Sequence, residues 1–206
     1  MAPLSGRLSG ISIPILTARL ALRLPKPSDV PFLMRRLNDS AVFRPLVSRH
    51  THFKKSEEVE WVRDSRKSAR KGEKLNLAIT LRESGTLIGG IGLEIRDWDN
   101  GRGWIGYWLA KPYWHRGYAS EAASAVSQIA FRRLKLHRID AAVFEFNPRS
   151  ARILRRLGFR QEGIRREVLF RDGRWHREFA FGLLARDFRP LRARTSPSRG
   201  DVGRDE

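Results

Sequence analysis

The chain is organised around residues 104–130, which read WIGYWLAKPYWHRGYASEAASAVSQIA. The first part, Trp104 to Leu109, is an aromatic and β-branched run that is typical of a strand, and it stops at the turn-prone pair Lys111-Pro112. From Ala119 onward, apolar residues recur every three or four positions, which predicts a helix. We therefore expect a strand that passes through a short turn directly into a helix.

The turn between these two elements is suited to an anion. Gly117 can adopt backbone conformations that are closed to other residues, and it lets a ligand approach the main chain. The first amides of the following helix lack partners inside the helix, and the helix dipole adds partial positive charge. The turn can therefore seat a pyrophosphate, although most glycine turns before helices are only connectors.

Three stretches give this turn a wider context. They read IGYWL at 105–109, WHRGYASEA at 114–122 and FNPRSARILRRLGFRQEG at 146–163. Together they resemble the GNAT acyl-CoA transferases, and among them the RimJ/RimL group of protein N-terminal acetyltransferases. The resemblance runs from about Thr17 to Phe188. It implies an α/β domain with the GNAT fold, in which a mostly antiparallel sheet has splayed central parallel strands and flanking helices.

The resemblance assigns the turn to acetyl-CoA. In the family the turn reads Gln/Arg-x-x-Gly-x-Gly/Ala and its amides hold the pyrophosphate; Gly117 and Ala119 match the last two positions. Trp114 stands where Gln or Arg is usual, which leaves the backbone cradle but removes one side-chain contact. The cofactor-binding residues implied are Leu109, Ala110, Trp114, His115, Arg116, Gly117, Tyr118, Ala119, Asn147 and Ser150.

Acyl transfer from a thioester to an amine needs a neutral amine, a polarised carbonyl and a proton for the departing thiolate. The resemblance implies direct attack by the amine, with strand amides around Leu109 and Ala110 polarising the carbonyl. Many family members carry a tyrosine as the acid where this chain has Leu154. The RimJ/RimL pattern Asn-x-x-Ser is matched by Asn147 and Ser150, so Ser150 is the expected thiol donor. Both residues are also ordinary helix caps.

Glu94 is the candidate general base. It interrupts the apolar run 91–95 on the strand expected beside the central one, where a carboxylate faces either solvent or a cleft. Glu145 has a similar claim. An α-amino group, with a pKa near 8, needs no more than a water path to lose its proton. The predicted catalytic residues are therefore Ser150 and Glu94.

Composition limits the other kinds of site. The chain has no cysteine, which excludes disulfides, thiolate metal sites and a cysteine nucleophile, and it suits a cytoplasmic location. His50 and His52 have no carboxylate near enough in sequence to complete a ligand set, so no metal is expected. No apolar run approaches the length of a membrane span.

The charge of the chain is strongly positive, at +19 with 41 Lys and Arg against 22 Asp and Glu. A basic fold attracts polyanions, so contact with RNA or the ribosome through a basic surface is one expectation. A solvated basic surface with a site for an anionic cofactor is the other, and the sequence favours neither.

The pattern along the chain predicts an N-terminal extension at 1–16, a GNAT domain at 17–188 and a disordered basic tail at 189–206. The tail is too polar to offset the entropy of ordering it. Within the domain, Ser28 and Ser56 are expected to cap two helices. Residues 75–81 and 86–95 read as a hairpin, and a closing hairpin between 168–170 and 175–184 turns at Asp172-Gly173.

The predicted function is acetyl transfer from acetyl-CoA to an amine in a ternary complex. The favoured acceptor is the N-terminal α-amine of a protein such as a ribosomal protein. Alternatives are a small amine such as a polyamine or aminoglycoside, a different acyl group such as succinyl, and a non-catalytic RNA- or ribosome-binding module on the same fold. A polycationic acceptor would be repelled unless a local acidic patch intervenes. A homodimer is also left open.

Overall fold

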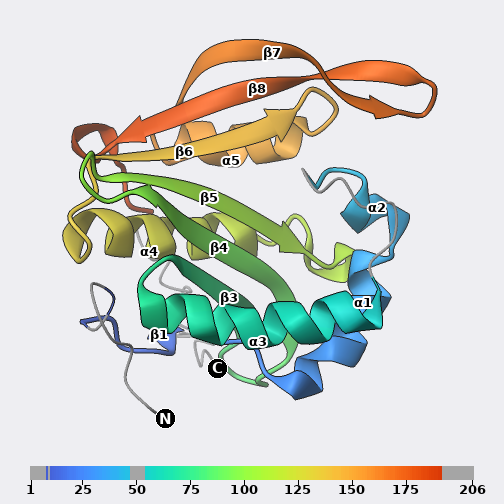
Figure 1. Cartoon of the computed structure of the whole chain (residues 1–206), viewed down its shortest axis with the longest axis vertical. Coiled ribbons are helices and arrows are strands. Elements are labelled where there is room, and N and C mark those ends of the chain that lie inside the picture. The colour runs from blue at the N-terminus through green and yellow to red at the C-terminus, as the bar shows by residue number, and fades with distance from the viewer. Residues whose placement is uncertain (1–7, 9, 47–53, 192–206) are drawn as a thin grey trace, which may run out of the picture.

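The computed structural model describes residue 8 and residues 10–46 and 54–191. In this part of the chain eight strands form one sheet in the order β1-β2-β3-β4-β5-β6-β8-β7, with helices on both faces (Figure 1). All neighbouring strands are antiparallel except the central pair, β5 and β6. The predicted fold class is confirmed. His50, His52 and the tail from residue 192 lie outside the described residues.

The elements in chain order are β1 (Ile15–Leu16), β2 (Leu20–Arg23), the 3-10 turn η2 (Pro27–Asp29), α1 (Val30–Leu37), α2 (Ser40–Phe43), α3 (Lys55–Lys71), β3 (Lys74–Leu81), β4 (Leu87–Asp97), β5 (Arg102–Leu109), η3 (Lys111–Tyr113), α4 (Tyr118–Arg132), β6 (Arg138–Phe144), α5 (Pro148–Arg156), β7 (Arg160–Arg171), β8 (Arg174–Leu184) and η4 (Ala185–Asp187). The first hairpin and the strand–turn–helix unit lie where the sequence predicts them.

The two faces of the sheet differ because side chains alternate along each strand. On one face, Ile91 and Leu93 of β4 join the main hydrophobic core, to which α4 contributes its alanines. On the other face, β4 presents Gly90, Gly92 and Glu94 toward α1 and α3, which share a smaller core of their own. Figure 1 shows α3 in front of the sheet and α4 behind it.

The two predicted serine caps are wrong. Ser28 lies inside η2, and the turn begins at Lys26, whose amide donates to the Asp29 carboxylate at 2.8 Å. Helix α3 begins one residue before Ser56, and the Lys54 amide donates to the Glu57 carboxylate at 3.1 Å. In both cases a carboxylate three residues further along accepts a hydrogen bond from the amide of the N-cap residue. The N-cap position therefore falls on a lysine, two residues before the serine.

The central strands diverge soon after they begin. β5 and β6 pair only from Arg102↔Arg138 to Trp104↔Asp140, whereas β5 stays paired with β4 as far as Leu109. Beyond Trp104 one edge of β5 therefore faces no strand. This confirms the predicted splay, and it opens the middle of the sheet to ligands.

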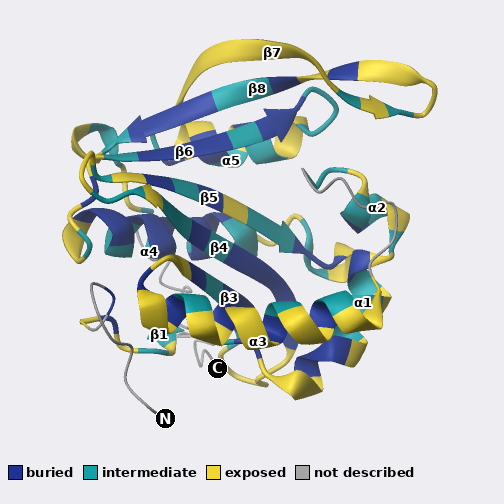
Figure 2. Ribbon diagram, viewed as in Figure 1, coloured by how far each residue is buried: buried dark blue, intermediate teal, exposed yellow. Residues whose placement is uncertain are grey.

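The closing hairpin is longer than predicted. β7 starts at Arg160, eight residues before the predicted segment, and most of its length is exposed (Figure 2). An exposed edge strand needs few apolar residues, so its sequence RQEGIRREVLFR carries little of the alternation that identifies a half-buried strand. The turn itself is confirmed, because Asp172 and Gly173 both have positive φ, at 52° and 74°.

Candidate active site

The turn before α4 presents open backbone amides to a cavity. Gly117 is the N-cap of α4 with φ of 80°, and it has no side chain to cap the helix. The first amide bonded inside the helix is that of Glu121, which donates to the Gly117 carbonyl at 3.1 Å. The amides of Tyr118, Ala119 and Ser120 therefore lack helical partners, and these residues line a cavity of about 940 Å³. This arrangement can bind an anion.

Arg19, from the loop between β1 and β2, holds the turn in place. Its guanidinium donates to the Arg116 carbonyl at 2.9 Å and to the Glu121 carboxylate at 2.8 Å, and it lies 4.6 Å from the centre of the Tyr118 ring. Burial raises the pKa of Glu121, but hydrogen bonds from Thr17 and Arg19 outweigh burial and lower it. Arg116 was expected to bind the cofactor; it does not line the cavity and contributes its carbonyl to this brace.

Trp114 fastens the turn to the end of the central strand. Its indole Nε1 donates to the Leu109 carbonyl at 2.7 Å, and the Arg149 guanidinium lies 5.5 Å from its ring. Where the family has Gln or Arg, Trp114 therefore uses its polar group for a hydrogen bond within the protein. It also lines the cavity, with His115, whose φ is 62°.

One of the two strand amides predicted to polarise the thioester carbonyl is not free. The Ala110 amide donates to the Ile88 carbonyl of β4 at 2.9 Å, so this assignment is wrong. Because backbone groups alternate along a strand, the amide of Leu109 points the other way, toward the splay, as does that of Tyr107. Leu109 also lines the cavity, so its amide keeps the predicted position.

Ser150 meets a partner that the sequence did not reveal. Its Oγ lies 2.9 Å from the Tyr107 hydroxyl, and either group can donate. Its amide donates to Asn147 Oδ1 at 3.3 Å, so the pair also forms the helix cap. Burial raises the pKa of Tyr107 well above its usual value, against the hydrogen bond to Ser150, so the phenol stays protonated at neutral pH. Two protonated hydroxyls therefore stand together at the splay.

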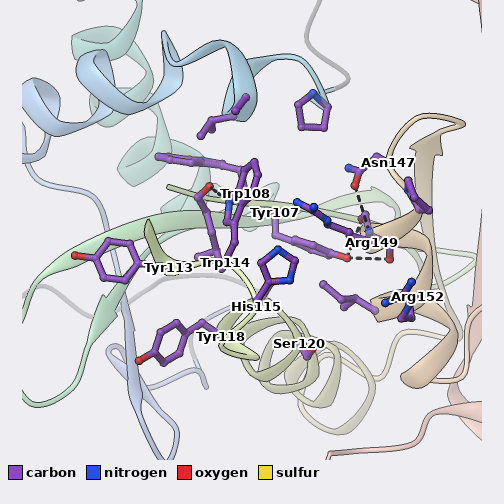
Figure 3. A pocket seen from close by; sticks show the side chains of 18 of the residues that line it. Tyr107, Trp108, Tyr113, Trp114, His115, Tyr118, Ser120, Asn147, Arg149 and Arg152 are labelled. Carbon is purple, nitrogen blue, oxygen red and sulfur yellow. Dashed lines mark hydrogen bonds between the residues drawn. The ribbon is translucent and has the colours of Figure 1, made fainter. Parts of the chain in front are cut away.

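The wall opposite the turn is basic. Arg149, Arg152 and Arg156 of α5 line the cavity, and Figure 3 shows the first two across from Tyr113 and Tyr118. Among the described residues, neither Arg152 nor Arg156 has an ion-pair partner. Open amides on one wall and arginines on the other suit a ligand with several phosphates, which is the chemistry of the coenzyme A nucleotide.

A second cavity, of about 870 Å³, lies between α3 and the glycine-rich face of β4 and β5. Its floor includes Gly90, Gly92 and Gly106, which leave room above the sheet. It meets the first cavity at the splay, where the residues that line both are Pro45, Leu46, Tyr107, Trp108, Asn147 and Ser150.

The second cavity is acidic although the chain is basic. The carboxylates that line it are those of Glu57, Glu58, Glu60, Asp64 and Glu94. Of the residues that the structure describes, Lys74 is the only cation in the lining. Three tryptophans, Trp61, Trp104 and Trp108, complete its walls. A patch of this kind attracts an ammonium group, and it removes the electrostatic objection to a cationic acceptor.

The two candidate bases lie in different places. Glu94 lines the second cavity, where its carboxylate is 3.5 Å from Lys74 Nζ. Glu145 lines neither cavity; it forms an ion pair with Arg177 at 2.6 Å, and its carboxylate lies within hydrogen-bond distance of His176 Nδ1, at 3.2 Å. The hydrogen bond from Arg177 lowers the pKa of Glu145. Geometry therefore keeps Glu94 near the site and separates Glu145 from it.

The described residues hold neither a metal site nor a membrane-spanning helix. No group of three or more His, Asp or Glu side chains in the described ranges could hold a metal ion. Over the same residues, every helix is too short or too polar to cross a bilayer.

Comparison with known proteins places this geometry in a family. The model of the acetyltransferase (GNAT) domain matches residues 19–160. A protein from Bacillus licheniformis described as the uncharacterized N-acetyltransferase p20 is 31% identical over 176 residues, covering 84% of this chain and 96% of that protein. The ribosomal protein uS5-alanine N-acetyltransferase of Escherichia coli K12 is 33% identical over 89 residues, covering 43% of this chain and 46% of the enzyme.

A solved structure shares the fold. Mycobacterium smegmatis RimJ in complex with a CoA-disulfide superimposes with a TM-score of 0.69 at 26% identity, covering 81% of this chain and 82% of RimJ.

Proposed function

This chain belongs to the GNAT acetyltransferase family and takes its acetyl group from acetyl-CoA, and we propose that the acceptor is the N-terminal α-amine of a protein. The observation that carries the proposal is the meeting of two cavities at Tyr107 and Ser150, one basic and one acidic. A polyanionic donor and an ammonium-bearing acceptor can enter from separate sides and meet there. The relative that acts on an alanine of ribosomal protein uS5 supports a protein acceptor.

We call the first, basic cavity the donor cavity and the second, acidic cavity the acceptor cavity. Different residues of the donor cavity would bind different parts of acetyl-CoA. The open amides at Tyr118 to Ser120 and the arginines of α5 would hold its phosphates. The bound thioester supplies the acetyl group. The Leu109 amide faces the splay and is placed to donate to a developing oxyanion. Ser150, supported by Tyr107, is placed to supply a proton to the leaving sulfur.

A small polyamine is the second candidate acceptor. The five carboxylates of the acidic cavity favour it, because a polycation would be attracted there in spite of the charge of the whole chain. A protein N-terminus and a polyamine would thus both enter the acidic cavity by an ammonium group. Contact between the ribosome and the basic surface would raise the local concentration of the protein acceptor.

Mass spectrometry after incubation with acetyl-CoA separates these acceptors. The panel is a peptide with a free N-terminal alanine and one internal lysine, the same peptide with a blocked N-terminus, and spermidine. We expect acetylation of the free N-terminus and none of the blocked peptide. Acetylation of spermidine alone would contradict the protein acceptor and establish the polyamine.

A further inference from the structure

Glu58 is a buried carboxylate that the acyl-transfer scheme above leaves without a role. It lies in the first turns of α3, it is 4% exposed, and it lines the acidic cavity. Among the described residues its carboxylate has no hydrogen-bond or ion-pair partner. A buried ionisable group without a partner is costly, because burial disfavours its charge. A buried ionisable group of this kind in a cavity is typical of a site that binds a ligand.

Among the described residues, the surroundings of Glu58 contain almost nothing that would neutralise its charge. Charged and titratable groups that line the same cavity are Glu57, Glu60 and Asp64 on α3, Lys74 on β3, Glu94 on β4 and Tyr107 on β5, while α1 contributes only Leu33 and Leu37. Lys74 already lies beside Glu94, at 3.5 Å. The described residues that line the cavity therefore supply no cation that would balance Glu58, and the acceptor carries one.

We propose that Glu58 is the residue that binds the ammonium group of the acceptor and takes its proton. The inference rests on the proposed function, and it names the catalytic carboxylate of the acceptor cavity. Glu94 was the sequence-based candidate for this role, but it is half-exposed and held by a lysine. Glu58 is enclosed, free and in the cavity that also contains Ser150.

The proton balance of the step is complete. The acceptor ammonium gives one proton to the Glu58 carboxylate, and the freed lone pair of the nitrogen forms the N–C bond to the acetyl carbon. The C–S bond breaks and the sulfur keeps its electron pair, then takes a proton from Ser150. The second proton lost by the nitrogen restores that of Ser150, and Glu58 releases its proton to solvent. No further reactant is needed.

The protonation behaviour of Glu58 suits this role. Burial, and secondarily the charge of Glu57, raises the pKa of Glu58 to about 7. A base with a pKa near the working pH is available in its charged form and accepts a proton readily. Below that pH the carboxyl is neutral and neither attracts nor deprotonates an ammonium group, so activity should fall on the acid side.

The test compares Glu58→Gln with a matched control, Glu83→Gln, in the full chain. Glu83 lies in the exposed turn between β3 and β4, outside both cavities. Each protein is assayed for kcat/KM from pH 5.5 to 9 with the alanine-initiated peptide, and for acetyl-CoA binding by calorimetry. We expect Glu58→Gln to lose about 10²- to 10⁴-fold in kcat/KM, to exchange the acid limb of Glu58 for one at about pH 8 set by the α-amine of the peptide, and to bind acetyl-CoA normally. The control should match the parent.

The outcomes separate this inference from the proposed function. If the parent acetylates the peptide and Glu58→Gln keeps both its rate and its acid limb, the inference is wrong and the proposed function stands. If the parent acetylates spermidine instead, the proposed acceptor is wrong, and the same pair of variants is compared on spermidine with the same two criteria. A variant that also loses acetyl-CoA binding would show a structural role and overturn the catalytic one.

Discussion

The two cavities that meet at the splay are built in different ways. The donor cavity takes its anion-binding groups from main-chain amides at one turn and from arginines on one short helix, so most of it comes from 109–120 and 146–156. The acceptor cavity takes side chains from α1, α3, β3, β4 and β5. A cradle of backbone amides recognises phosphate whatever the acceptor is. A cavity made of side chains can change with the substrate while the donor cavity stays the same.

The largest effect should come from Gly117→Val in the donor cavity. The φ of 80° is strained for a β-branched residue, and the new Cβ would lie 3.3 Å from the Arg19 guanidinium that holds the turn. Loss of two or three charge-assisted hydrogen bonds, at about 1.5 to 3 kcal/mol each, should weaken acetyl-CoA binding by about two orders of magnitude or more. Calorimetry measures this directly.

The control is Gly85→Val in the turn between β3 and β4. Gly85 has a similar φ of 68° and open space around it, so the variant carries the same backbone strain away from both cavities. It should bind acetyl-CoA like the parent. If Gly117→Val bound as tightly as this control, the phosphates would have to sit elsewhere.

The next effect concerns stability in the acceptor cavity. The pKa of Glu58 is raised in the folded state, so between its unfolded value of 4.5 and about 7 the folded protein binds more protons than the unfolded chain, and stability falls as pH rises. Gln has no such dependence. Urea unfolding should show Glu58→Gln gaining on the parent by up to about 3 kcal/mol between pH 4.5 and pH 8. A pH-independent difference would contradict the raised pKa.

A smaller effect is expected where the cavities meet. Ser150→Ala keeps the helix cap, because that bond uses the serine amide, and it removes the hydroxyl beside Tyr107. Turnover should fall by about ten- to a hundredfold with acetyl-CoA affinity nearly unchanged, since water can stand in as the donor. Steady-state kinetics and calorimetry separate the two quantities. Ser84→Ala, in an exposed turn, is the control, and equal rates for both variants would remove Ser150 from the proton path.

The smallest effect should come from Glu94→Gln. Glu94 is held by Lys74 and is not the proposed base, so its loss should change only the electric field in the cavity. We expect an effect of about 1 kcal/mol or less on the reaction, which is about fivefold or less in kcat/KM. The measurement is kcat/KM on the alanine-initiated peptide. A loss of a hundredfold or more, with a normal rate for Glu58→Gln, would return the role of base to Glu94.

The donor cavity was predictable because its signals are local. The strand, Gly117 and the helix repeat lie within one stretch, and Asn147 and Ser150 lie in one motif. The brace by Arg19 joins residues about a hundred positions apart, and nothing local marks it. The Ala110 amide was misassigned because the direction of a strand amide depends on its register with β4.

The acceptor cavity was largely hidden in the sequence. Glu58 reads as one of several acids on an amphipathic helix, and its burial follows only from how α3 packs over the glycines of β4 and β5. Tyr107 reads as a core aromatic in a strand, and it is one, but its hydroxyl reaches α5 across the splay. Contacts between elements of this kind require the tertiary arrangement.

The divergence of β5 from β6 has a consequence for how the protein behaves in a crowded cell. A strand with one unpaired side normally invites another chain to add to the sheet, which leads to aggregation. Here the unpaired side of β5 is in the middle of the sheet, flanked by β6, α5 and the turn before α4. A slender ligand can reach it, whereas a second sheet cannot. The splay thus exposes main-chain groups to the substrate without itself offering a template for self-association.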